Sequence, residues 1–99
     1  MRLTTTQVEL IRNTAKQLLG EGVRVTLFGS RVDDTLRGGD VDILVEVSKS
    51  ISEPARLSAR IASRISRAMN GRRVDVVLDA PNLLRQPIHD IARHTGVVL

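Results

Sequence analysis

Periodic and alternating apolar positions divide the chain into helical and strand-like segments. Over residues 6–19 the apolar positions recur every three or four residues, which predicts a helix with one buried face. Thr6 followed by Glu9 predicts a capping box at the start of this helix. Residues 23–29 and 40–47 alternate between apolar and polar side chains instead, so both stretches are predicted strands. In the second of them, one face is expected to be core and the other to carry charge.

A second helix, a third strand and a short last helix complete the predicted order. Pro54 predicts a helix start, because proline at the first helical position loses no needed hydrogen bond. The apolar stripe of this helix ends at Asn70-Gly71, residues 72–79 alternate as a strand does, and residues 88–92 indicate a short helix. The order α-β-β-α-β-α predicts an α+β (mixed α/β) fold in which helices cover a small mixed β-sheet.

Length and composition limit the number of domains and the place where the protein works. At 99 residues the chain is too short for two hydrophobic cores, so we expect a single domain over residues 1–99. No apolar run approaches the roughly 20 residues that span a bilayer, and the first residues lack the apolar core of a signal peptide. We therefore expect a cytoplasmic protein with no membrane contact. Because cysteine is absent, disulfides, thiolate metal sites and cysteine nucleophiles are excluded, and carboxylates lead as metal ligands.

Arginine dominates the charge of the chain. There are 15 basic and 11 acidic residues, a net charge of +4, and every basic residue except Lys16 and Lys49 is arginine. Guanidinium groups pair well with phosphate, which points to anionic partners. The single aromatic residue, Phe28, argues against readout of exposed bases by stacking. Four arginines align on one face of the second predicted helix, either as a solvated face or as an electrostatic footprint for RNA or an acidic protein: Arg56, Arg60, Arg64 and Arg67.

Three aspartates on predicted strands form the candidate chemical centre. Asp40 and Asp42 lie two residues apart, so they point from the same face of their strand with β-carbons about 6–7 Å apart. Asp75 lies on the polar face of the third strand, and it joins the other two if the strands are neighbours. Three carboxylates this close repel one another unless a hard cation such as Mg²⁺ neutralises them. The pattern therefore predicts a metal site.

A glycine and a hydroxyl residue end the first predicted strand. Without a β-carbon, Gly29 lets backbone amides approach an anion, the Ser30 hydroxyl can donate to a phosphate oxygen, and Arg31 adds positive charge. A Gly-Ser pair alone is usually a turn. Here nine residues separate it from the Asp-Val-Asp of the next strand, and this order favours a phosphate site.

The same stretches resemble a known family. Residues 27–31 (LFGSR), 37–46 (RGGDVDILVE) and 74–77 (VDVV) resemble the nucleotidyltransferase superfamily of the DNA polymerase β type, and are most similar to its minimal, single-domain (MNT-type) members. The resemblance implies a nucleotidyltransferase fold. It also implies nucleotide binding at Gly29, Ser30 and Arg31, two metal ions at Asp40 and Asp42, and, at Asp75, completion of the catalytic-metal site and deprotonation of the acceptor hydroxyl.

The resemblance further implies a reaction and partners. The protein would be a Mg²⁺-dependent enzyme with two metal ions, for which Mn²⁺ is a substitute, that moves a nucleoside monophosphate from a nucleoside triphosphate, ATP foremost, to a hydroxyl acceptor. Small members of the family work with a separately encoded helical protein of the HEPN type or a related substrate-binding subunit, often as antitoxin and toxin, and an oligomer is expected. A tyrosine of that partner, or the end of an RNA, is the implied acceptor. Two alternatives stay open: a non-catalytic interaction module that neutralises its partner by binding, and a nucleic-acid-binding protein that uses the arginine face.

Other conspicuous residues have simpler interpretations. Asp79 is expected to end its strand, and the acidic pair at residues 33–34 to lie in a solvated loop. The five-residue spacing of His89 and His94 does not place both on one helical face, so both are expected at the surface rather than at a metal. The apolar end at residues 97–99, together with the arginine face, is expected to meet a partner protein.

Overall fold

The structure, a computed structural model, describes residues 3–29 and 40–99. Within these ranges the chain forms three helices and four strands, in this order: α1 (Thr5–Leu19), β1 (Arg24–Phe28), β2 (Val41–Glu46), α2 (Pro54–Ala68), β3 (Val74–Asp79), α3 (Pro87–Thr95) and β4 (Val97–Val98). The predicted α-β-β-α-β-α order is confirmed, and β4 is an addition to it. None of the helices in these ranges combines the length with the apolar character that a membrane crossing requires.

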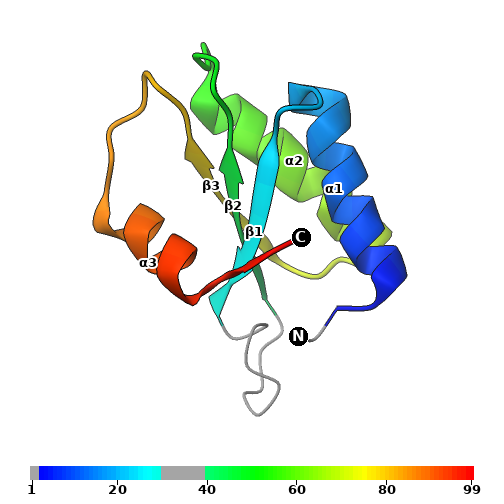
Figure 1. Ribbon diagram of the computed structural model, residues 1–99. Coiled ribbons are helices and arrows are strands. Elements are labelled where there is room, and N and C mark those ends of the chain that lie inside the picture. Colours follow the sequence, from blue (N-terminus) through cyan, green and yellow to red (C-terminus); the bar gives the residue numbers. More distant parts are fainter. Residues whose placement is uncertain (1–2, 30–39) are drawn as a thin grey trace.

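The described strands form a mixed sheet with the order β3-β2-β1-β4 (Figure 1). β2 runs antiparallel to β1, which in turn pairs antiparallel with β4. β3 runs parallel to β2, because α2 carries the chain back along the sheet between them. The first residues of β2 and β3 therefore lie at the same end of the sheet, where β1 finishes. This end is where the sequence places its candidate chemistry.

Helices cover both faces of the sheet. α1 and α2 lie on one face and enclose the larger core, while α3 lies on the opposite face (Figure 1). On the α3 side, Phe28, Leu44 and Ala92 are buried together. The face of β2 that is expected to carry charge is thus buried at its centre, because Leu44 has no exposed surface. Charge persists on this face at the two ends of the strand, at Asp42 and Glu46.

The start of α1 differs from the sequence prediction by a small shift. The Thr4 hydroxyl accepts a hydrogen bond from the Gln7 amide at 3.1 Å, and the Gln7 side-chain carbonyl accepts one from the Thr4 amide at 3.0 Å. This reciprocal pair is the capping box of the helix. The box predicted at Thr6 and Glu9 is wrong, because both residues already lie inside the helix that Thr4 caps.

α2 begins at Pro54, as predicted, and its buried side chains Ile61 and Ile65 face the core. The helix ends before Asn70 and Gly71, which adopt left-handed φ angles of 59° and 78°. Asparagine and glycine are the residues that tolerate this conformation at a helix end. The chain then turns directly into β3, so the C-terminal end of α2 lies at the same end of the sheet as the first residues of β2 and β3.

The apolar chain end forms β4, which the sequence prediction missed. Val97 and Val98 pair with Leu27 and Thr26 of β1, and the Leu99 amide donates to the Val25 carbonyl at 2.9 Å. Two residues are too few to show an alternating pattern. Val98 nevertheless remains 52% exposed, so this edge of the sheet still presents apolar surface.

Candidate active site

The parallel pairing of β2 and β3 brings two of the predicted carboxylates together. Asp42 and Asp75 are direct partners in the register of the two strands, and Phe28, the last residue of β1, is the partner of Asp42 on the other side. Neighbouring strands lie about 4.8 Å apart, and partners in register point to the same face of the sheet. The condition set by the sequence, that the two aspartate-bearing strands be neighbours, is therefore met.

Asp42 lies close to two other negative charges, those of Asp75 and Asp40. Its pKa is raised above the ordinary value by partial burial first, then by the negative charges of Asp75 and Asp40 and a side-chain hydrogen bond with Asp75, against a smaller opposing effect of the Arg73 guanidinium. A hydrogen bond between two carboxyl groups requires a proton on one of them. The pair thus has a need for positive charge, which either a proton or a cation can meet.

Asp40 is the third predicted aspartate, and it does not belong to the direct pair of Asp42 and Asp75. It is exposed, lies immediately before β2, and acts on Asp42 through its charge. Within residues 3–29 and 40–99, no three carboxylate or imidazole side chains are already arranged as a metal-binding group. The oxygen donors of Asp42 and Asp75 nevertheless suit a hard divalent cation such as Mg²⁺ or Mn²⁺ in their chemistry. The chemistry of the two paired carboxylates therefore fits such an ion.

Gly29 packs directly against the carboxylate pair. Its φ of 78° lies in the left-handed region, and a β-carbon built on it would overlap the Asp42 carboxylate oxygen and stand 3.2 Å from Asp42 Cγ. A side chain at this position would therefore displace Asp42 as well as strain the backbone. The glycine predicted as a phosphate site thus also shapes the carboxylate site. The other two predicted nucleotide-binding residues, Ser30 and Arg31, lie outside the described residues, as does the acidic pair at residues 33–34.

Arg73 is a residue of this site that sequence reasoning did not assign to it. Its Nε lies 3.4 Å from Asp75 Oδ1, and both side chains are well exposed, at 73% and 44%. The signal was present in the sequence, since residues two apart near the start of a strand lie on the same side of it. An exposed pair of this kind contributes little to stability, but it places a cation beside the carboxylates.

A second charged cluster lies at the opposite end of β2 and β3. Glu46 and Asp79 are also partners in register, and Arg93 of α3 bonds to both, with its Nε 3.1 Å from the Glu46 carboxylate. Asp79 ends β3, as predicted. Unlike the Asp42 pair, these two carboxylates have a cation of the chain held between them, so they form a structural ion-pair cluster.

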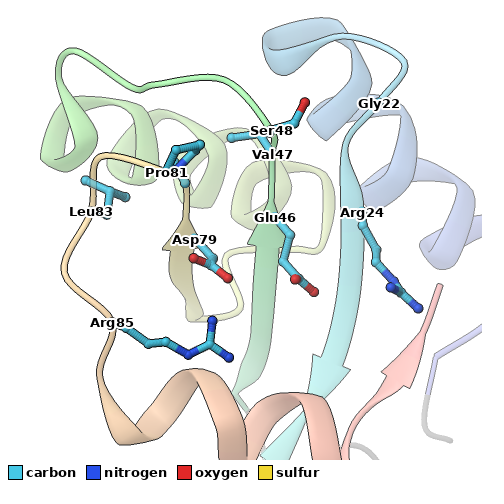
Figure 2. Close-up of a pocket in the computed structure, with 10 residues that line it drawn as sticks. Gly22, Arg24, Glu46, Val47, Ser48, Asp79, Pro81, Leu83 and Arg85 are labelled. Atoms are coloured by element: carbon cyan, nitrogen blue, oxygen red, sulfur yellow. The ribbon is translucent and has the colours of Figure 1, made fainter.

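A shallow pocket of about 490 Å³ opens beside this cluster (Figure 2). Glu46 and Asp79 point into it from the sheet, Arg24 borders it on β1, and Arg85 reaches toward it from the loop before α3 (Figure 2). Asp42 does not line this pocket, because it lies at the other end of the same strand. The hollow and the carboxylate pair are therefore separate features of the sheet.

His89 has a structural environment that differs from the prediction. Its side chain is 4% exposed; its Nε2 lies 2.9 Å from the Leu78 carbonyl, and its Nδ1 lies 2.9 Å from the Gln86 amide, which donates to it. The expected surface position is wrong for His89, because its ring turns inward to bond to the carbonyl of Leu78 in β3. His94 is exposed, as expected.

A comparison with known proteins places this arrangement in context. A family model described as a nucleotidyltransferase domain matches residues 8–97. The matched range extends from α1 to β4 and includes the carboxylate pair and Gly29. A search of curated proteins gave no significant match.

Proposed function

Because the chain belongs to the nucleotidyltransferase domain family, we propose that it moves a nucleoside monophosphate from a nucleoside triphosphate to a hydroxyl acceptor at Asp40, Asp42 and Asp75. The observation that carries this proposal is the direct partnership of Asp42 and Asp75 across β2 and β3. The like charges of this pair, beside a glycine that admits no side chain, are costly to stability. Such a cost is typical of a functional site.

The carboxylates have separate tasks in this proposal. Asp40 and Asp42, with Asp75, hold two divalent metal ions, Mg²⁺ or Mn²⁺, which supply positive charge to the triphosphate when bound. Asp75, whose side chain is 44% exposed, accepts the proton of the acceptor hydroxyl at a carboxylate oxygen. The hydroxyl oxygen forms a bond to the α-phosphorus, the bond from the α-phosphorus to the bridging oxygen breaks, and pyrophosphate leaves.

The end of β1 binds the triphosphate. The left-handed conformation of Gly29 turns the chain beside Asp42 and leaves no β-carbon between the backbone and a phosphate oxygen. By family resemblance, Ser30 and Arg31 follow with a hydroxyl donor and a positive charge. ATP is the first donor to test.

The acceptor comes from a partner in the cytoplasm. We assign this role first to a helical HEPN-type protein encoded nearby, with the present chain as the catalytic antitoxin of the pair. Exposed apolar side chains on α3 and β4, Ile91 and Val98, supply surface for such a complex. Truncation of residues 97–99 is a poor test of this interface, because it also removes β4 from the sheet.

The experiment is a transfer assay with the purified chain, alone and with the neighbouring gene product, in Mg²⁺ and each α-labelled nucleoside triphosphate. We expect label to enter a macromolecular acceptor and pyrophosphate to be released in equal amount. Asp42→Asn should abolish the labelling and the release of pyrophosphate. The control Asp90→Asn makes the same change at an exposed residue of α3, which pairs with Arg85 of the preceding loop, and should abolish neither. Stable partner binding with no release of pyrophosphate from any triphosphate would favour the non-catalytic interaction module instead.

A further inference from the structure

The two ends of the β2 and β3 pair have the same layout of charges, but one end is closed and the other open. At the closed end Glu46 and Asp79 are held by Arg93, which contacts both carboxylates and has a side chain only 27% exposed. At the end that holds the candidate site, Arg73 bonds to Asp75 with a side chain that is 73% exposed. Arg93 is enclosed between its carboxylates, whereas Arg73 can leave Asp75 without opening the core.

The backbone of Arg73 is fixed, and its side chain lies in solvent. Its carbonyl accepts a hydrogen bond from the Val41 amide at 2.9 Å, so the residue belongs to the ladder between β2 and β3. Arg73 Nε donates to Asp75 Oδ1 at 3.4 Å, which is long for a bond between two charged groups. An exposed ion pair of this length is weak. The guanidinium group is thus anchored beside the site but is free to change its partner.

A divalent cation and the Arg73 guanidinium compete for the same carboxylate. The metal ions of the proposed site are held in part by Asp75, and one oxygen of this side chain already accepts a bond from Arg73. The positive charge of Arg73 also acts on Asp42, the register partner of Asp75. Like charges so close to one another repel. Arg73 is therefore expected to weaken the binding of a metal ion alone.

A triphosphate at Gly29 reverses the effect of this charge. β1 and β3 flank β2, so Gly29 and Arg73 belong to chain segments two strand spacings, about 10 Å, apart. Charges still interact over about this distance at 0.1 M salt, and guanidinium groups pair well with phosphate oxygens. The exposed arginines of α2 cannot take this part, because they lie over the opposite face of the sheet (Figure 1). Arg73 thus opposes the metal alone and favours the metal together with the triphosphate.

We propose that Arg73 exchanges partners: its guanidinium neutralises Asp75 in the metal-free chain and binds the phosphates of the triphosphate when divalent ions occupy the carboxylates. The inference rests on the proposed function and adds a substrate-binding residue to it. Through this exchange Arg73 couples the binding of metal to the binding of nucleotide. The carboxylates then fill with metal chiefly when the triphosphate is present.

The first test measures the binding of Mn²⁺ without nucleotide, by isothermal titration calorimetry at low salt. Arg73→Gln should bind Mn²⁺ about threefold more tightly than the wild type, a factor in the range of an exposed charge pair. Arg72→Gln is the matched control, because Arg72 is exposed and has no ion-pair partner within residues 3–29 and 40–99. It should change the affinity much less, and circular dichroism checks the fold of each variant.

The second test adds α,β-methylene-ATP, an analogue that cannot transfer its nucleotide. In Mn²⁺, Arg73→Gln should bind this analogue about threefold more weakly than the wild type, so the two tests change affinity in opposite directions. With ATP and acceptor, the KM for ATP should rise more than kcat falls. Arg73→Lys keeps the charge and should lie closer to the wild type in both tests, which a merely structural role of Arg73 does not predict. Both differences should shrink as salt is raised.

The outcomes separate this inference from the proposed function. Mn²⁺ binding that is no tighter in Arg73→Gln than in Arg72→Gln would overturn the competition for Asp75. Equal affinity of these two variants for the analogue would overturn the contact with phosphate. Either result, with transfer by the wild type that Asp75→Asn abolishes, would leave the proposed function standing. Failure of the wild type to bind Mn²⁺, with and without the analogue, would contradict both.

Discussion

Asp42→Asn should stabilise the protein in the absence of metal and nucleotide. At neutral pH the wild-type chain holds the Asp42 and Asp75 carboxylates on neighbouring strands, with the charge of Asp40 nearby. Asparagine keeps the shape of the side chain and removes one of the like charges. Most substitutions destabilise a protein, so a gain at this position would be specific to the repulsion described here.

The size of the gain follows from the separation and exposure of the two carboxylates. Two unit charges 4 Å apart interact with about 1 kcal/mol in water and about 4 kcal/mol near a protein surface. Because the Asp75 side chain is 44% exposed, solvent screens the repulsion and the lower value applies. A gain of about 1 kcal/mol in the free energy of unfolding corresponds to roughly 4–8 °C in Tm for a domain of this size.

The effect has a defined dependence on pH. The folded pKa of Asp42 is raised above its ordinary value of 3.8, so the folded state binds the proton more tightly than the unfolded state does. The contribution of Asp42 to wild-type stability should therefore fall as the pH rises from 3.8 through the raised pKa. The advantage of Asp42→Asn should be largest above that pKa and absent below 3.8.

Thermal unfolding followed by circular dichroism, with EDTA at pH 3 to 8, measures this difference. Mg²⁺ and ATP should then raise the Tm of the wild type, as any ligand of the folded state does, and raise that of Asp42→Asn much less. A metal-free variant that is less stable than wild type at neutral pH would refute the repulsion at the pair. Equal stabilisation of both proteins by Mg²⁺ and ATP would refute the role of Asp42 as a ligand.

Three further substitutions test the surroundings of the site and the ion-pair cluster. Gly29→Ala should lower the free energy of unfolding by about 1–2 kcal/mol in a urea titration and also reduce transfer, because the added methyl strains a left-handed backbone and displaces Asp42; unchanged transfer would contradict the close packing of these two residues. Arg93→Met should cost about 2–3 kcal/mol at neutral pH by the same titration, because it leaves the two partly buried carboxylates of the cluster without a cation; unchanged stability would contradict the structural role of the cluster. His89→Ala should cost about 1–3 kcal/mol by removing the partner of the Leu78 carbonyl, while transfer per folded molecule stays at the wild-type rate; a loss of transfer in the folded variant would show that His89 is more than structural.

Much of the fold can be predicted from the sequence because its apolar periods are long and regular. The helix over 6–19 and the strands over 23–29 and 40–47 match α1, β1 and β2 to within a residue or two. The errors arise where a contact distant in sequence decides the outcome. β4 forms because Val97 and Val98 pair with the edge of β1 that β2 leaves open. Leu44 is buried because α3 packs over it.

The candidate site shows the same division. Residue type and spacing identify Asp40, Asp42 and Asp75, but the partnership of the last two depends on the parallel register of β2 and β3, which no local pattern determines. The close approach of Gly29 to the Asp42 carboxylate, which leaves no room for a β-carbon, likewise depends on the tertiary structure. The position of Arg73 beside Asp75, by contrast, follows from their two-residue spacing alone and was predictable from the sequence.

The claim that the paired carboxylates are the active centre is tested most directly by the initial rate of pyrophosphate release in Mg²⁺, ATP and acceptor for Asp75→Asn and its control Asp90→Asn. Asp75→Asn should retain a native circular dichroism spectrum and lose at least about a thousandfold in rate, because groups that act as a unit in catalysis lose most of their effect together. Asp90→Asn should stay close to the wild-type rate. A folded Asp75→Asn protein that releases pyrophosphate as fast as wild type would place the chemistry elsewhere in the chain and contradict the account.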